Sequence, residues 1–334
     1  MRQLKTFVVL VAAGLAVAAF AQYTSPELLF VTDYGGTTPL GATVPAQIER
    51  YDPYTGAYLG AFGAGYVSDP TGIAIQGSEA YVTDPFSYGG TYFTRIDKFN
   101  FSTGAYDGSI MDSSAYNLFG LSDYGSNLLA CDYGDPSVGN DGVYTFNSAG
   151  SQTGFWALPA GSEAESIAAD GSHSYIATAG GPGLMSYNLD ANGLTTGLNF
   201  TAGAGNVYFG AAAFAAKGSA YAAGLNSSAV GVIDEFSTSG VLLSEYTNGS
   251  QGFDSLAFGH NGIMYAFDAL NDQILRFDGT VPLNFGPLGS FALNDTADGR
   301  RMAVYAAPEP VSMLTLGLGI AGLALRKRRR SRSH

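Results

Sequence analysis

A four-residue apolar phrase recurs six times through the chain, and its regular spacing constrains the fold more than any other feature of the sequence. The copies read FVTD, YVTD, LACD, YIAT, YAAG and YAFD, and they begin at Phe30, Tyr81, Leu129, Tyr175, Tyr221 and Tyr265. The steps between successive copies are 51, 48, 46, 46 and 44 residues. Self-similarity at a period of this size indicates a repeat architecture, in which each copy belongs to one supersecondary unit.

Two further patterns accompany this phrase. A hairpin pattern follows each copy, as in IERYDPYTGAYLGAF from Ile48 and IDKFNFSTGAYDGSI from Ile96, where an alternating strand reaches an aromatic residue, turns and resumes. Its other copies begin at Val143, Leu184, Val232 and Ile274. Glycines for the positive φ of these turns are Gly56, Gly104, Gly150, Gly193 and Gly240. A short apolar strand also precedes the phrase, as in GIAIQG from Gly72. Each unit is therefore expected to form four short strands.

Units of four short strands at this period are the sequence signature of β-propeller blades. The body opens in mid-blade with LLFVTD, a second strand, and it closes on RMAVY at residues 301–305, which matches the missing first strand. Pairing these two segments would close the ring and remove its open edges. The alternative, a pair of Greek-key sandwiches, does not explain why the same order of phrases returns six times. We predict an all-β, six-bladed β-propeller with terminal strand closure over residues 22–306.

The body also resembles the NHL-repeat and related six-bladed propellers. PTGIA from Pro70 running to YVTD, and FDSLA from Phe253 running to YAFD, look like the repeat of that family. In the units that begin near Ser166 and Gly210, alanines replace larger residues. The resemblance implies the fold and not an activity, because this group includes binding scaffolds, lactonases and lyases.

The first 21 residues have the order of features of a secretory signal peptide. Arg2 and Lys5 precede an apolar run over residues 7–20. The run ends in AFA, the small-x-small pattern that a signal peptidase accepts. A buried N-terminal helix would not explain why these features occur together in this order. We predict cleavage between Ala21 and Gln22, and export of the chain.

Charge is distributed unevenly along the chain. Of the 15 Lys and Arg residues, two lie in the predicted signal peptide and six in the last nine positions, whereas all 28 Asp and Glu residues lie between. The body from Gln22 to Pro310 therefore carries a formal charge of about −21, and such a surface repels the nucleic acid backbone. The sequence predicts a soluble body that does not bind nucleic acid and that could collect divalent cations weakly.

The body contains few residues and motifs that are typical of an enzyme active site. The two His residues there, His173 and His260, fall in predicted turns, and the sequence has no G-x-S-x-G elbow, H-E-x-x-H motif or paired cysteines. Cys131 is the single cysteine, and we expect it as a buried small apolar residue rather than a free thiol. NDTADG from Asn294 and GNDG from Gly139 lack the full spacing of a calcium loop and are expected as turns.

Aspartates that end the repeated phrase are the candidates for a bound cation. They are Asp33, Asp84, Asp132 and Asp268. In a ring these carboxylates could gather around one end of the central channel and hold Ca²⁺ or another divalent cation. Asp after a strand is also ordinary turn chemistry, which is the interpretation we favour. Thr178 and Gly224 stand at the same place in the other two units and weaken the idea of a ring site.

Three features follow one another near the end of the sequence. Pro308-Glu309-Pro310 comes first, an apolar segment over residues 311–325 follows, and a basic cluster ends it. The cluster consists of Arg326, Lys327, Arg328, Arg329 and Arg330. As a transmembrane helix the apolar segment measures about 22 Å, shorter than the roughly 30 Å hydrocarbon core of a bilayer. It can span only if the basic end reaches back to the interface, where the positive-inside rule keeps it cytoplasmic. This geometry favours a segment that is held and then processed over a plain single-span anchor.

This order of features resembles the PEP-CTERM sorting signal of Gram-negative bacteria. The resemblance implies recognition by a membrane-embedded exosortase and cleavage near Pro308-Glu309-Pro310. It also implies passage from an inner-membrane intermediate to the cell surface or extracellular matrix, usually in organisms that make exopolysaccharide. No LPxTG precedes the apolar segment, so ordinary sortase anchoring is not supported. The expected division is a signal peptide over 1–21, the propeller over 22–306 and the sorting signal over 307–334.

The expected function is that of an exported surface or matrix protein that binds a partner or builds structure, without catalytic residues. Its expected partners are the exosortase, the signal peptidase, and an exopolysaccharide or matrix protein of a biofilm. The alternative is a metal-dependent hydrolase or lyase of the lactonase type, which would use the central channel and the strand-end aspartates.

Overall fold

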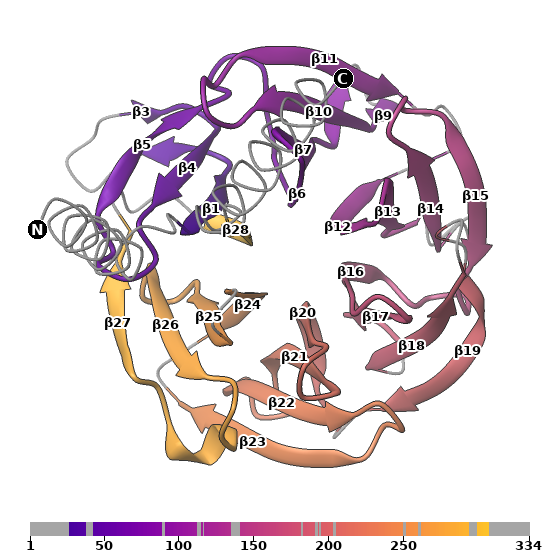
Figure 1. Ribbon diagram of the computed structural model, residues 1–334, viewed down its shortest axis with the longest axis vertical. Helices are drawn as coiled ribbons and strands as arrows, with labels where there is room; N and C mark the ends of the chain where they lie inside the picture. Colours follow the sequence, from indigo (N-terminus) through magenta and orange to yellow (C-terminus); the bar gives the residue numbers. More distant parts are fainter. Residues whose placement is uncertain are drawn as a thin grey trace, which may run out of the picture. The chain divides into compact units, whose positions relative to one another are not determined.

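Six antiparallel four-stranded sheets surround a common centre in the computed structural model of the chain (Figure 1). The structure describes residues 27–306, except for residues 38–42, 89–90, 112–114, 116, 135–140, 182, 191–192, 194, 203–204, 250–251, 260–261 and 294–298. Residues 28–305 form one compact unit. The predicted signal peptide and the predicted sorting signal lie outside the described residues.

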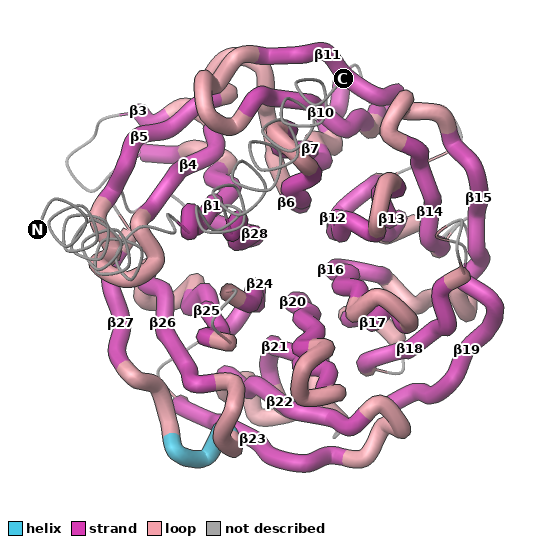
Figure 2. Tube along the Cα trace, in the orientation of Figure 1, coloured by secondary structure: helices cyan, strands magenta, loops and turns pink. Residues whose placement is uncertain are grey.

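Each sheet is one blade, and its strands are named here from the centre outward (Figure 2). Blade 1 consists of β28 (Gly299–Ala306), β1 (Glu27–Asp33), β4 (Gln47–Tyr51) and β5 (Tyr58–Phe62). Blade 2 consists of β6 (Gly72–Gln76), β7 (Glu79–Thr83), β10 (Arg95–Asn100) and β11 (Tyr106–Met111). Blade 3 consists of β12 (Leu118–Tyr124), β13 (Asn127–Asp132), β14 (Gly142–Asn147) and β15 (Gln152–Ala157). Blade 4 consists of β16 (Ala164–Ala169), β17 (His173–Thr178), β18 (Leu184–Leu189) and β19 (Thr195–Ala202). Blade 5 consists of β20 (Val207–Phe214), β21 (Ser219–Leu225), β22 (Gly231–Ser237) and β23 (Leu242–Asn248). Blade 6 consists of β24 (Phe253–Phe258), β25 (Ile263–Asp268), β26 (Gln273–Asp278) and β27 (Gly289–Ala292).

The innermost strand of blade 1 comes from the opposite end of the described chain. β28 lies beside β1, and the Arg301 backbone N–H donates to Thr32 Oγ1 at 3.0 Å. Among the described residues, the only helix is one 3₁₀ turn, η1 (Leu283–Phe285). The prediction of an all-β, six-bladed propeller closed by pairing of its terminal strands is confirmed.

The repeated apolar phrase is the second strand of each blade. In β7, β13, β17 and β25 every residue after the first is buried, because neighbouring blades cover both faces of these strands. The outermost strands differ, since β15 and β23 alternate between more and less exposed residues. A strand that is covered on both faces needs apolar residues throughout, which is why this strand repeats most clearly in the sequence.

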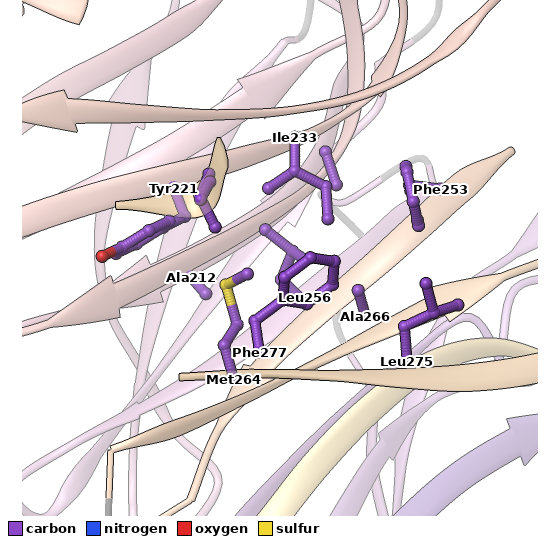
Figure 3. Close-up of a cluster of buried hydrophobic side chains, with 11 residues drawn as sticks. Ala212, Tyr221, Ile233, Phe253, Leu256, Met264, Ala266, Leu275 and Phe277 are labelled. Carbon is purple, nitrogen blue, oxygen red and sulfur yellow. The ribbon is translucent and has the colours of Figure 1, made fainter. Parts of the chain in front are cut away.

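Apolar side chains of adjacent blades interdigitate, and Figure 3 shows one such cluster between blades 5 and 6. Ala212 and Tyr221 come from blade 5, and Leu256, Met264 and Phe277 come from blade 6. Small residues beside large ones let the two sheets approach closely enough to exclude water. The backbone ladder of each sheet stays within one blade. The ring is therefore held together by packing between blades and by side-chain hydrogen bonds such as that from Met302 N to Ser255 Oγ.

The third and fourth strands are joined by the predicted glycine-containing hairpin in five blades and by a longer connection in blade 6. Hairpin glycines adopt positive φ, as at Gly104 (74°) and Gly240 (81°). In blade 6 residues 279–288 join β26 to β27 and contain η1, because Pro282 and Pro287 cannot continue a strand ladder.

Two short hairpins that we did not predict lie between the second and third strands of blades 1 and 2. They are β2 (Gly36–Thr37) with β3 (Thr43–Val44), and β8 (Phe86–Tyr88) with β9 (Thr91–Phe93).

Candidate functional site

The six innermost strands line a central channel, which is where a propeller places most of its convergent side chains. The residues at its middle level, one from each blade, are Ile73, Leu121, Ile167, Ala211, Leu256 and Met302. These side chains are apolar, so this level supplies neither a cation ligand nor an acid-base group. The channel widens on one side to a cavity of about 210 Å³ and narrows on the other to a cavity of about 40 Å³.

The two ends of the channel are named here the open end, which is wide, and the closed end, which is narrow. Residues late in the first strands, such as Ile75, Asp123 and Val304, line the open end. Residues early in these strands, such as Gly72 and Arg301, line the closed end. All six inner strands therefore run in the same direction, from the closed end to the open end. The face of the ring around each end takes the same name.

Arg301 closes the narrow end by reaching across the channel. It stands on β28 in blade 1, and its Nη2 lies 2.9 Å from Glu165 Oε2 on β16 in blade 4, the blade on the opposite side of the ring. Its Nη1 donates to the Asp254 carbonyl at 2.7 Å. Only 9% and 13% of the Arg301 and Glu165 side chains are exposed. The two charges therefore neutralise each other where water screens them little.

A β-bulge brings the partners of Arg301 within its reach. The register shifts at the same place in the first strand of four consecutive blades, at Leu118/Leu121, Ala164/Ser166, Tyr208/Gly210 and Phe253/Ser255. In blades 4 and 6 the extra residue is Glu165 or Asp254. A bulge inserts a residue outside the ladder and re-aims it, so that these positions can face the channel end rather than the neighbouring blade.

Aromatic and acidic side chains lie beside this ion pair on the closed face. The ring centroids of Phe119 and Tyr133 are 5.4 Å apart, and both side chains are half-buried. Burial raises the pKa of the Tyr133 phenol, and the nearby carboxylates of Glu163 and Glu165 raise it further. We refer to Phe119, Tyr133, Glu163, Glu165 and Arg301 as the rim cluster. It combines an aromatic surface, carboxylate acceptors and a guanidinium at one place.

The strand-end aspartates hold backbone N–H groups within their own blades. Asp84 Oδ1 accepts from Ser68 N at 2.9 Å and Asp69 N at 2.6 Å, and its Oδ2 lies 2.7 Å from Arg95 Nη2. Asp132 Oδ1 likewise accepts from Asn117 N at 2.8 Å. The backbone donors Ser68, Asp69 and Asn117 belong to the connections that lead into the first strands of the same blades.

The other two strand-end aspartates are engaged in a similar way. Asp268 Oδ1 accepts from Gly252 N at 3.0 Å, and its Oδ2 accepts from the side-chain amides of Asn271 and Gln273. Asp33 Oδ1 accepts from Gly35 N at 2.7 Å. All four aspartates are at most 1% exposed. Within the part of the chain that the structure describes, no three His, Cys, Asp or Glu side chains are grouped so that they could hold a metal ion.

A Ser, His and Asp group occurs in the turn between β16 and β17, but its geometry is that of a turn. His173 Nδ1 lies 2.8 Å from Ser172 Oγ and 3.3 Å from Asp170 Oδ2. A catalytic relay needs the serine and the carboxylate on different ring nitrogens, whereas here both lie at Nδ1. Burial alone would raise the pKa of Asp170, but hydrogen bonds from the backbone of Ser172 and His173 outweigh it and lower the pKa. His173 was predicted in a turn but is the first residue of β17, directly after the turn, and His260 lies outside the described residues.

Cys131 is fully buried, as predicted. Its Sγ accepts from Gly120 N at 3.1 Å, and burial raises the pKa of the thiol to about 12. A thiol with this pKa carries almost no thiolate near neutral pH and is therefore unreactive in the folded protein.

The C-terminal segment matches a known family model. Residues 306–330 match the PEP-CTERM protein-sorting motif. The chain carries a PEP-CTERM sorting signal. The match includes the predicted Pro308-Glu309-Pro310 and the basic cluster up to Arg330, and it indicates an exported protein of a Gram-negative envelope that an exosortase processes. No curated protein matches the chain significantly.

Apart from Ala306, the matched segment lies outside the residues that the structure describes. Among the residues described, no helix is long and apolar enough to cross a membrane. The predicted transmembrane helix over residues 311–325 and the predicted signal cleavage between Ala21 and Gln22 both fall outside this part. The NHL-like resemblance of the body stays a prediction.

Proposed function

We propose that the protein is an exported binding or structural protein of the cell surface or extracellular matrix, linked to exopolysaccharide or a biofilm. In this proposal a signal peptidase cleaves between Ala21 and Gln22, and the exosortase acts at Pro308-Glu309-Pro310. The position of the sorting motif carries the proposal. The last strand of the ring ends at Ala306, and the match to the motif begins at the same residue. Removing the tail therefore leaves every blade with its four strands.

Three features of the described ring support binding over catalysis. The middle of the channel is apolar, Arg301 and Glu165 occupy its closed end, and the strand-end aspartates hold backbone N–H groups. A lactonase-type hydrolase or lyase would need several carboxylates turned toward one cation. The contacts of Asp84, Asp132 and Asp268 direct these side chains into their own blades instead.

The rim cluster supports a carbohydrate as the partner. Half-buried aromatic rings such as Phe119 and Tyr133 can cover the apolar face of a sugar ring, and carboxylates such as Glu163 can accept its hydroxyl groups. Because the body carries a formal charge of about −21, it repels polyanions. A neutral glycan therefore fits the body better than an acidic one.

Replacing Pro308, Glu309 and Pro310 together by alanine tests the sorting step. We expect the wild-type protein in the surface or matrix fraction and the variant in the inner-membrane fraction, because the exosortase no longer recognises it. Ser148→Ala, in an exposed turn of blade 3, is the control and should be sorted normally. Equal recovery of the triple variant and the wild type at the surface would contradict the proposal.

A glycan array tests the partner. We expect binding of the purified protein to neutral glycans, and Tyr133→Ala should weaken it. Tyr54→Ala is the matched control, because Tyr54 is an exposed tyrosine in a turn on the open face. A protein that bound no neutral glycan, or that lost binding equally in both variants, would exclude the rim cluster as the binding surface.

A further inference from the structure

The direction of the inner strands fixes the face from which the chain leaves the ring. Every inner strand begins at the closed end and finishes at the open end, as the residues that line the two cavities demonstrate. In β28, Arg301 lies at the closed end and Val304 at the open end. β28 ends at Ala306, two residues beyond Val304. β28 therefore ends on the open face. It lies beside the channel, as Figure 1 shows.

We propose that the unprocessed protein is held on the cell envelope by its open face and directs the closed face toward its partners. This inference rests on the proposed function, because it takes residues 311–325 as the segment held in the membrane before processing. It assigns an orientation to the ring. The closed face, with the rim cluster and the hairpins β2–β3 and β8–β9, is directed away from the membrane.

The length of the connecting chain decides between this orientation and the reverse. From Ala306 to Val311 the chain advances five residues, which span at most about 18 Å when fully extended. To reach the closed face, the chain would first cross the open face from β28 to β5, three strand spacings or about 14 Å. It would then run along the height of the blade, about 23 Å for a strand of seven residues. The required path is more than twice the length of the connection.

The channel offers no shorter path. At its middle level it is lined by packed apolar side chains, and at the closed end Arg301 crosses it to reach Glu165. A chain that passed through would have to break this ion pair and leave two buried charges without partners. The reverse orientation would therefore require unfolding of blade 1.

Chemical labelling of introduced cysteines tests the orientation. Ser126→Cys lies in a turn on the open face, and Ser227→Cys lies in a turn on the closed face; both serines are exposed in short turns between adjacent strands. Native Cys131 gives no background because it is fully buried. The full chain is expressed in a strain without the exosortase, so that the precursor stays in the inner membrane. Spheroplasts are treated with a bulky polyethylene-glycol maleimide that does not cross the membrane.

We expect Ser126→Cys to be labelled several-fold more slowly than Ser227→Cys in spheroplasts, and the two to be labelled at equal rates after solubilisation in detergent. Equal rates in spheroplasts, or faster labelling of Ser126→Cys, would overturn the orientation while leaving the proposed export intact. If both cysteines were labelled only after lysis, the propeller would be inside the cell, and the proposed function would fail together with the inference.

Discussion

Replacing Arg301 by methionine should lower the free energy of unfolding by about 3–5 kcal/mol. Methionine keeps most of the apolar stem but removes the guanidinium that bonds Glu165 at 2.9 Å and the Asp254 carbonyl at 2.7 Å. The variant therefore leaves the Glu165 carboxylate largely buried without its partner. Breaking a buried ion pair from one side is costly because the remaining charge keeps its desolvation penalty and loses its attraction.

A double variant separates this charge effect from the loss of packing. Arg301→Met combined with Glu165→Gln should cost only about 1–2 kcal/mol, because no uncompensated charge remains. Arg276→Met is the matched control. Arg276 also links two blades, since its Nη1 donates to the Tyr54 carbonyl at 2.6 Å, but this contact is exposed. Its loss should cost about 1 kcal/mol or less.

Urea unfolding followed by the fluorescence of Trp156, the single tryptophan of the chain, measures all four proteins. Arg301→Met should have the lowest midpoint, and the double variant should regain part of the loss. An Arg301→Met protein within about 0.5 kcal/mol of the wild type, in the range of an ordinary surface substitution, would refute it. A double variant at least as unstable as the single one would refute it equally.

Three further predictions follow from buried carboxylates. Asp84→Ala should lower the free energy of unfolding by about 3 kcal/mol, because Asp84 is buried, accepts from two backbone N–H groups and pairs with Arg95. The control Asp52→Ala, in an exposed turn, should lower it by about 1 kcal/mol. Equal urea midpoints for the two variants would contradict this prediction. Burial raises the pKa of Asp234 to about 6, although hydrogen bonds from Tyr208 and Asn206 oppose this shift. Because the folded-state pKa lies above the unfolded one, the stabilisation is fully present below about pH 4 and is lost as the pH rises through about 6. Asp234→Asn should remove this loss, on the order of 2–3 kcal/mol, and urea midpoints that depend on pH as in the wild type would contradict it. Treatment with EDTA should leave the thermal midpoint unchanged, because the strand-end aspartates hold backbone N–H groups; a lowered midpoint that Ca²⁺ restores would revive the cation site.

The architecture could be predicted from the sequence because the same strand is buried in the same way in every blade. Second strands such as β7 and β25 lie between two neighbouring blades and need apolar residues, so the four-residue apolar pattern recurs in all six blades. The closing strand was predictable for a related reason. Residues 27–33 match a second strand, and residues 301–305 match a first strand that lacks a blade.

The closed end of the channel was not predictable, because its parts are far apart in the sequence. Arg301 and Glu165 are 136 positions apart and meet only when the ring is complete. The bulge that aims Glu165 depends on a register shift of one residue, which leaves no composition signal. One signal was present in Arg301 itself, since it is the one charged residue of the predicted inner strand over residues 301–305, and a buried charge needs a partner. The connection with η1 was likewise marked by Pro282 and Pro287.

Intact mass and C-terminal peptide mapping of the exported protein test the central claim, that a closed propeller is delivered by a removable sorting signal. We expect an N-terminus at Gln22 and a C-terminus between Ala307 and Val311, with all residues of β28 retained. A strain without the exosortase should yield the chain with its tail. Recovery of exported protein that still carries Arg326 to His334 would contradict the account.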